Sequence, residues 1–116
     1  MSILYNSLEH FREEFNSNNH VGKLLKDWTP NIIISSSDTD EKFTIKVNAD
    51  KKINVNKGEE NSQHQILVEA EEETLTDVFT GISNPSEVVL DGMMQVFGSD
   101  NDQIRLDAIT LIMWGM

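Results

Sequence analysis

The residue pair whose types and spacing most clearly suggest chemistry is His10 and Glu14. They are four residues apart in a segment with helical periodicity, so their side chains share one helix face and could hold a metal ion together. A stable metal site needs further ligands, and the sequence offers no third residue at a matching spacing. We therefore interpret this pair as solvated surface.

Two short acidic motifs are similar to the opening of a calcium-binding loop. Residues 38–40 read Asp-Thr-Asp, and residues 100–102 read Asp-Asn-Asp. Neither motif continues with the glycine and the bidentate glutamate that such a loop requires. We expect the first motif to form a turn and the second to form a helix cap.

The serine run at residues 35–37 offers hydroxyl groups that could act as nucleophiles. It lacks a Gly-x-Ser-x-Gly context, and neither His20 nor His64 can be paired with a serine from the sequence. The three glutamates at residues 71–73 could attract a basic partner, but their position at a helix N-terminus, where the peptide dipoles place partial positive charge, is the simpler explanation. We therefore expect no catalytic site, no metal and no cofactor, in a protein that is not an enzyme.

The composition excludes several classes of function. The chain has 116 residues, with 9 Lys and Arg against 20 Asp and Glu, and its formal net charge of −11 repels nucleic acid. It has no cysteine, so it can form neither a disulfide nor a Cys-ligated metal site. No run approaches the roughly 20 apolar residues that cross a bilayer, and the first residues lack a secretory pattern. We expect a soluble, cytoplasmic protein that binds no nucleic acid and has no integral membrane segment.

The first part of the chain shows helical periodicity. An amphipathic helix that ends within residues 16–19 is predicted by the spacing of Leu4, Leu8, Phe11 and Phe15. A second, shorter helix is expected over residues 20–28, because Pro30 would stop it.

After Pro30 the apolar pattern changes to a period of two, which is typical of strands. Five strands are predicted, over residues 32–34, 43–47, 53–55, 64–70 and 93–97. The first three should form an antiparallel meander with one face in water. Two short helices should follow the fourth strand, one that starts at residues 71–73 and ends at Gly81, and one that starts at Asn84-Pro85 and ends at Gly92.

The closing helix, which follows Gly98 and Ser99, is apolar on two faces. One face carries Ile104, Ala108, Leu111 and Ile112, and the other carries Leu106, Ile109, Met113 and Trp114. Such a helix needs apolar partners on more than one side. A core sandwiched between sheet and helices, a subunit interface, or the wall of a cavity for an apolar ligand would each supply them.

In the order and spacing of its elements, the segment 66–98 resembles the sterol carrier protein type-two family. The resemblance extends from Trp28 onward and is carried by Thr80-Gly81, by Asn84-Pro85 with Val88 and Val89, and by the alternation of Gly92, Met94, Val96 and Gly98. It implies an α+β fold in which helices cover a twisted, mostly antiparallel five-stranded sheet. It also implies an apolar tunnel between sheet and helices for sterols, fatty acyl chains or acyl-CoA.

On this resemblance we expect a single domain over residues 1–116, with a helical segment at 1–28 and the sheet and helices at 31–116. Its function would be the non-enzymatic binding or carriage of a hydrophobic ligand. The implied ligand-binding residues are Leu75, Val78, Phe79, Val88, Val89, Met94, Phe97, Leu106, Ile109, Met113 and Trp114. The alternative is an accessory protein-interaction module, bound to an enzyme or to a second copy as a homodimer, that uses the apolar closing helix and has no free ligand site.

Overall fold

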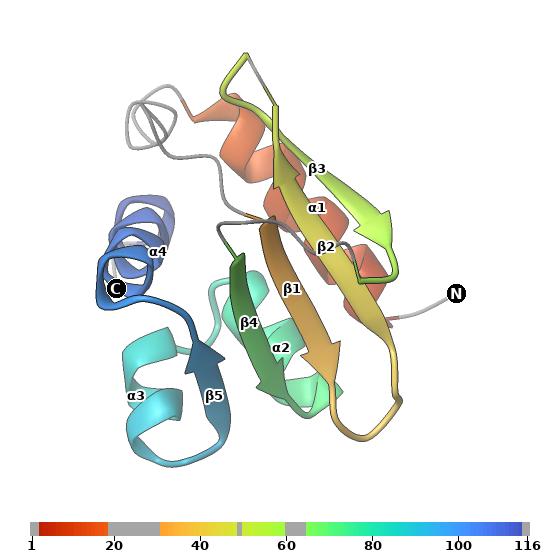
Figure 1. Cartoon of the computed structure of the whole chain (residues 1–116), viewed down its shortest axis with the longest axis vertical. Helices are drawn as coiled ribbons and strands as arrows, with labels where there is room; N and C mark the ends of the chain where they lie inside the picture. The colour runs from red at the N-terminus through yellow and green to blue at the C-terminus, as the bar shows by residue number, and fades with distance from the viewer. Residues whose placement is uncertain (1–2, 19–30, 49, 60–64, 115–116) are drawn as a thin grey trace.

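The computed structural model describes residues 3–18, 31–48, 50–59 and 65–114, and for residues 65, 107 and 109–114 it describes the backbone only. Figure 1 shows how the helices and strands of these residues are arranged. In chain order they are α1 (Ile3–Ser17), β1 (Asn31–Ser36), β2 (Lys42–Val47), β3 (Ile53–Lys57), β4 (Gln65–Ala70), α2 (Glu72–Phe79), α3 (Pro85–Leu90), β5 (Met94–Phe97) and α4 (Asp100–Trp114). The helix predicted over residues 20–28 lies outside the described residues.

The five strands form one open sheet in the order β3-β2-β1-β4-β5. The first three strands pair antiparallel, as predicted for a meander, and β4 pairs antiparallel with β5. β1 and β4 run parallel, so the chain leaves β3 at one edge of the sheet and returns on the far side of β1 (Figure 1). The expected α+β fold with a mostly antiparallel five-stranded sheet is therefore confirmed.

The central strand β1 is buried along its whole length. Successive side chains of a strand point to opposite faces, so Ile32 and Ile34 face the helices while Ile33 faces the other side. Ile33 and its partner in β2, Thr44, have no exposed surface, so the prediction that one face of the meander lies in water is wrong at these positions. Burial on both faces explains why the middle of this strand, residues 32–34, is an apolar run rather than an alternating pattern.

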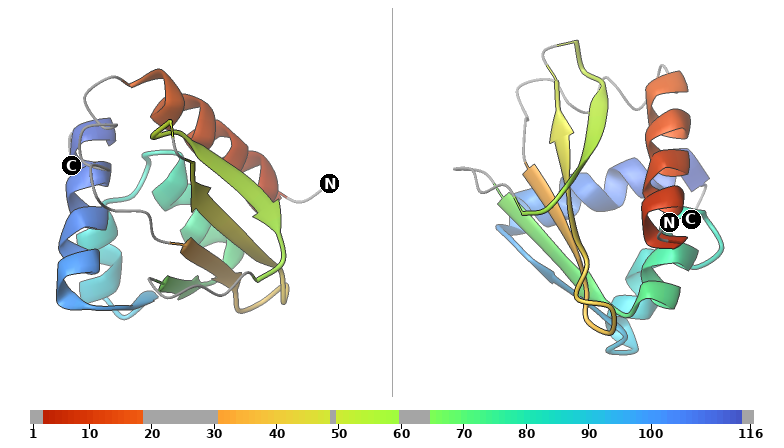
Figure 2. Two further views of the ribbon diagram at one scale, coloured as in Figure 1. Left: turned by 45° about the horizontal axis from the view of Figure 1, so that its top comes forward. Right: turned by 90° about the vertical axis from the view of Figure 1, so that its right-hand side faces the viewer.

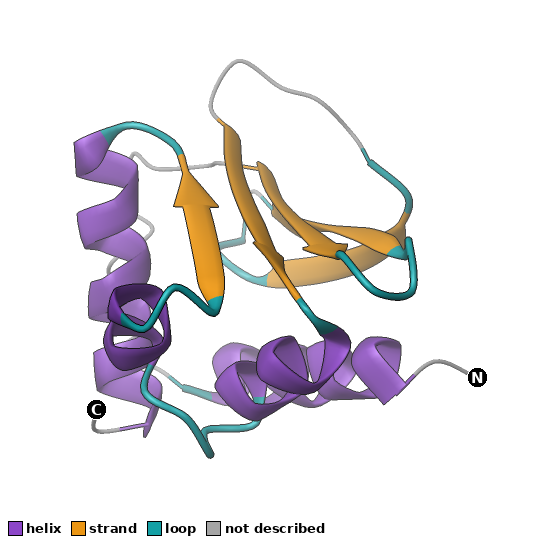
Figure 3. Cartoon of the chain, turned by 90° about the horizontal axis from the view of Figure 1, so that it is seen from below, coloured by secondary structure: helices purple, strands orange, loops and turns teal. Residues whose placement is uncertain are grey.

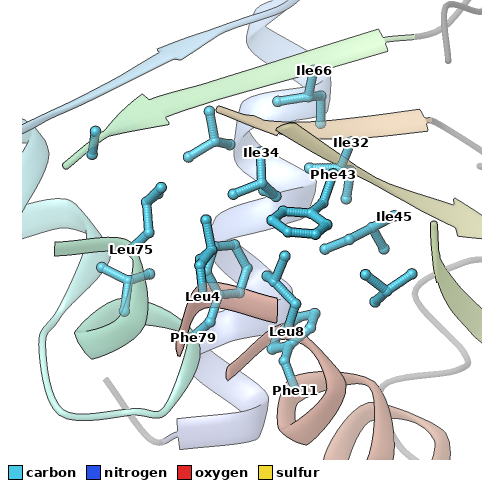
Figure 4. Close-up of a cluster of buried hydrophobic side chains, with 14 of the residues drawn as sticks. Leu4, Leu8, Phe11, Ile32, Ile34, Phe43, Ile45, Ile66, Leu75 and Phe79 are labelled. Carbon is cyan, nitrogen blue, oxygen red and sulfur yellow. The ribbon is translucent and has the colours of Figure 1, made fainter. Parts of the chain in front are cut away.

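Helices α1 and α2 cover one face of the sheet and contact each other (Figures 2 and 3). The ring of Phe11 in α1 meets the ring of Phe79 in α2 edge to face, with 5.0 Å between centroids. Figure 4 shows the core that forms between these helices and the sheet. The residues that helical spacing predicts for the apolar face of α1 are all buried there: Leu4, Leu8, Phe11 and Phe15.

The start of α2 is capped from a distant turn. Glu71 occupies the N-cap position, but its own side chain makes no capping hydrogen bond. Instead, a carboxylate oxygen of Asp38 accepts a hydrogen bond from the backbone N–H of Glu72 at 2.9 Å and another from the Ser36 hydroxyl at 2.8 Å. These hydrogen bonds, with the one from Glu72 dominant, lower the pKa of Asp38 below its ordinary value of 3.8.

The end of α1 is joined to the edge strand β3. Asn16 donates its amide N–H to the carbonyl oxygen of Ile53 at 3.1 Å and accepts from the N–H of Ile53 at 2.8 Å. Ile53 is almost fully buried, so these backbone groups have little access to water. One side chain therefore satisfies both polar groups of a buried edge residue.

Replacing Asn16 by Ala should lower the free energy of unfolding by about 1–3 kcal/mol, because it leaves both Ile53 backbone groups without their partner. Asn6→Ala on the exposed face of the same helix is the matched control and should change stability much less. Urea denaturation followed by circular dichroism measures both. Equal losses in the two variants would contradict the proposed role of Asn16.

Asp38→Asn should flatten the dependence of stability on pH in acid. Because the pKa of Asp38 is lowered by folding, its contribution to stability is fully present well above pH 3.8 and is lost as the pH falls through the folded-state pKa. The wild type should therefore lose more stability than the variant as the pH is lowered below about 4. Asp40→Asn, in the same turn, is the control, since asparagine tolerates the φ of 59° there. In thermal melts across this range, Asp40→Asn should lose stability in parallel with the wild type, whereas Asp38→Asn should not.

Candidate functional site

Helix α3 forms one wall of the candidate site, and its start follows the predicted signals. The Asn84 side chain accepts a hydrogen bond from the N–H of Ser86 at 2.9 Å, and Pro85 occupies the first helical position. The chain leaves α3 through Gly92, whose φ of 77° is readily adopted only by glycine. The predicted helix between Asn84 and Gly92 is therefore confirmed.

Helix α4 forms a second wall. Its capping side chain is Ser99, whose hydroxyl accepts from the N–H of Asp102 at 3.1 Å, so the cap lies one residue before the motif 100–102 to which the sequence assigned it. Gln103 is held by a hydrogen bond from its Nε2 to the carbonyl oxygen of Gly98 at 3.1 Å. This bond fixes the orientation of the first turn of α4 against the end of β5.

A cavity of about 330 Å³ lies between these walls. It is bounded by the sheet at β4 and β5, by the end of α2, and by α3 and the start of α4, which lie together at one end of the molecule (Figure 1). The lining residues are Val68, Val78, Phe79, Pro85, Ser86, Val89, Leu90, Met94, Val96, Gln103 and Leu106. The volume is at the lower end of the roughly 300–1,000 Å³ that small-molecule sites occupy.

The lining is chemically uniform. Apart from Ser86 and Gln103, the side chains that line the cavity are apolar, and within the described part of the chain none carries a charge. Leu90 is 85% exposed and Val89 is 40% exposed, although both line the cavity, so α3 borders its opening to solvent. Such a surface can bind a ligand by removing apolar area from water, and its polar groups among the described lining residues are the Ser86 hydroxyl and the Gln103 amide.

Five of the residues expected to bind a ligand line this cavity: Val78, Phe79, Val89, Met94 and Leu106. Leu75 and Val88 are buried in the core instead, and neither is among the lining residues. Phe97 is 51% exposed and pairs with Leu67, on the sheet face opposite to Val96. The side chains of Ile109, Met113 and Trp114 lie outside the described residues.

Sequence reasoning missed other lining residues, and two of them carried a usable signal. Val68 and Val96 alternate with outward-facing neighbours in predicted strands, so both belong to the helix-covered face, and the sheet register pairs them directly. Pro85, Ser86, Leu90 and Gln103 have no such signal, because their positions depend on how α3 and α4 are placed beside the sheet.

A second, more polar hollow of about 390 Å³ lies where β4 runs into α2. Its lining includes Ser37, Glu69, Glu71, Thr74 and Gln95. No group of three or more His, Cys, Asp or Glu in the described residues could hold a metal ion, and this covers the hollow as well as the pair His10 and Glu14. Among the described helices, none combines the length and the apolar character needed to cross a lipid bilayer.

Comparison with known proteins gives matches in structure alone. No protein-family model matches the sequence, and no curated protein matches it either. The sterol carrier protein domain 2 of Helicoverpa armigera superposes with a TM-score of 0.67 at 13% identity, over 99% of this chain and 91% of that one. The palmitated SCP2L2 of Aedes aegypti gives a TM-score of 0.61 at 13% identity, over 95% of each chain.

A larger protein contains a similar unit. The sec-alkylsulfatase Pisa1 of Pseudomonas sp. gives a TM-score of 0.63 at 11% identity over 80% of this chain, but the chain spans only 14% of the sulfatase.

The protein belongs to the α+β class and has an open sheet covered on one face by helices. More particularly, its fold is that of the sterol carrier protein 2 domains, as the sequence resemblance predicts.

Proposed function

We propose that this protein binds and carries a hydrophobic ligand, without catalysis, in the cavity between β4, β5, α2, α3 and α4. The observation that carries the proposal is the lining, which is apolar except for Ser86 and Gln103. The fold supports it, since one protein of this fold is described as palmitated. A fatty acyl chain, an acyl-CoA and a sterol-like lipid are the ligand classes considered, with residues 1–116 acting as one domain in the cytoplasm.

The hydrophobic effect alone supplies useful affinity in such a site. Each methylene moved from water into an apolar environment contributes ~0.8 kcal/mol, so a dozen contribute ~10 kcal/mol. Association costs ~4 kcal/mol or more, which leaves ~6 kcal/mol, or a Kd of some tens of micromolar. Binding at this level requires no charged contact and no covalent step.

The variant Val89→Glu should weaken the binding of an uncharged, environment-sensitive fluorescent dye by at least about tenfold, because it places a carboxylate in the apolar lining. Val89 is 40% exposed, so the variant should still fold. Ile82→Glu is the matched control, since Ile82 is 72% exposed and is not a lining residue. Fluorescence titration measures both, with thermal melting as a check on folding. Unchanged dye affinity in folded Val89→Glu would place the ligand elsewhere.

The second candidate is the interaction module, and one observation favours it. The large apolar side chains with high exposure are concentrated in and around α3, β5 and the start of α4: Ile82, Val89, Leu90, Met93, Phe97 and Ile104. Apolar surface gathered at one end of a molecule is typical of a protein-protein contact. If this interpretation is right, a second copy of the chain or an enzyme would cover this apolar end of the protein.

Native mass spectrometry of protein purified from cells distinguishes the two candidates. A carrier should show monomers with an added mass of about one lipid per chain, which an organic extraction removes. An interaction module should show ligand-free dimers whose abundance falls on dilution. Ligand-free monomers that bind no dye would count against the carrier proposal.

A further inference from the structure

The more polar hollow, of about 390 Å³, is a separate feature of the molecule. It lies where β4 ends and β5 begins, at the lower end of the sheet in Figure 1, and it shares no lining residue with the apolar cavity. Val68 and Val96 are paired in the sheet and face the cavity. Their neighbours Glu69 and Gln95 are also paired, and they face the opposite side of the sheet. The hollow is therefore not an extension of the proposed carrier site.

Two carboxylates line this hollow without an internal partner. Glu69 belongs to β4, and Glu71 lies two residues further on, at the N-cap position of α2. The backbone N–H of Glu72 donates to Asp38, so the Glu71 carboxylate is not used for capping. Among the described residues, neither lining glutamate makes a side-chain hydrogen bond or an ion pair. Both carboxylates can therefore accept hydrogen bonds from a bound molecule.

A buried hydroxyl group indicates a ligand independently of the acidic residues. Thr74 is 7% exposed and lines the hollow, yet its hydroxyl has no hydrogen-bond partner among the described residues. In that part of the chain, Thr76 supplies the only side-chain oxygen that is both fully enclosed and unpartnered, so the Thr74 oxygen is open to the hollow. Buried polar groups almost always have a hydrogen-bond partner. This oxygen therefore marks a position for a partner from outside the chain.

The charge around the hollow is negative and is not balanced locally. No basic residue is among its described lining residues. Lys42 is on the same face of the sheet, but it pairs with Ser35, which in turn pairs with Glu69, so about 10 Å separates its strand from β4. The Nζ atom of Lys42 lies 3.4 Å from a carboxylate oxygen of Glu59. Because Asp38 at the start of α2 adds a further negative charge, a cation is favoured in the hollow.

The remaining lining favours a cation on a short alkyl stem. Ala70 and Met93 add apolar surface, and Met93 is 55% exposed, so a methylene chain could lie against it. The Gln95 amide oxygen and the Thr74 hydroxyl add acceptors beside the two carboxylates. A guanidinium group matches this set, because it is planar, carries five N–H donors and accepts no hydrogen bond. A metal ion does not match it, since no group of three or more His, Cys, Asp or Glu in the described residues could hold one.

We propose that this hollow is a second binding site, specific for a guanidinium group on a short alkyl stem, as in the side chain of arginine. Glu69 and Glu71 accept N–H groups of the ligand, and Thr74 accepts a further one. The inference does not depend on the proposed carrier function, since the two sites have no residue in common. The guanidinium group could belong to a small free molecule or to an arginine of a partner protein, and the test distinguishes these sources.

The test is titration of the isotope-labelled protein with n-butylguanidinium, n-butylammonium and n-butylurea, followed by backbone amide chemical shifts. The three probes share one alkyl stem, and the urea has the planar shape of the guanidinium without its charge. Saturable shifts should occur at the amides of Glu71, Thr74 and Gln95, with a millimolar Kd for the guanidinium at about 20 mM salt. We expect the ammonium to bind at least about threefold more weakly, and the urea at least about tenfold more weakly.

Variants at matched positions test the lining residues. Glu69→Gln and Glu71→Gln should each raise the guanidinium Kd at least about fivefold, because each removes one charged acceptor. Glu73→Gln removes the same charge from an exposed position in the first turn of α2 that does not line the hollow, and should change the Kd less than about twofold. Thr74→Val should raise the Kd about two- to threefold, with thermal melting as the check on folding.

A Gly-Arg-Gly peptide blocked at both ends identifies the source of the group. If it binds at least about tenfold tighter than n-butylguanidinium, the site takes an arginine of a partner protein, whereas equal affinities indicate a small free molecule. Absence of saturable shifts, equal Kd values for guanidinium and urea, or an unchanged Kd in both glutamate variants would overturn the inference. So would displacement of the dye by n-butylguanidinium, since that result would place the group in the apolar cavity.

Discussion

The structure depends on one constraint, the burial of β1 on both of its faces. Its apolar run pairs antiparallel with β2 on one side and parallel with β4 on the other, so β1 joins the N-terminal meander to the C-terminal half of the chain. Ile32 and Ile34 face the core beneath α1 and α2, and Ile33 is buried on the opposite face. Without this strand, β4 and β5 would have no sheet to join, and the cavity beside them would lack its floor.

The sequence predicts those parts of the fold that local patterns determine. The buried face of α1 and the Asn84 cap of α3 depend on residues within a few positions of one another, and the antiparallel pairing of the first three strands joins segments that follow each other in the chain. These three features are confirmed. The parallel pairing of β1 with β4 could not be predicted in this way. The same holds for the hydrogen bonds of Asp38 with α2 and of Asn16 with β3, which join residues 34 and 37 positions apart.

In the candidate site, too, local sequence patterns predict some of the residues and not others. Phe79 and Met94 were named from the resemblance and do line the cavity, whereas Leu75 is turned into the core, because a short helix buries one face against the sheet and another against α1. Met94 and Phe97 were both expected in the site, yet three residues along a strand place side chains on opposite faces. The alternation of side chains along β5 places Val96 on the cavity side of the sheet and Phe97 on the other side. The cavity itself depends on the placement of α3 and α4, which no local pattern encodes.

The contact between Asn16 and Ile53 has a consequence for the behaviour of the protein in a crowded solution. β3 is an edge strand, and an edge with unpaired N–H and C=O groups is a template on which another chain can add a strand. Because the Asn16 side chain of α1 bonds both the N–H and the C=O of Ile53, these two groups are not available to hydrogen-bond an added strand. The amide that joins α1 to the sheet thus also shortens the stretch of this edge on which another strand could pair.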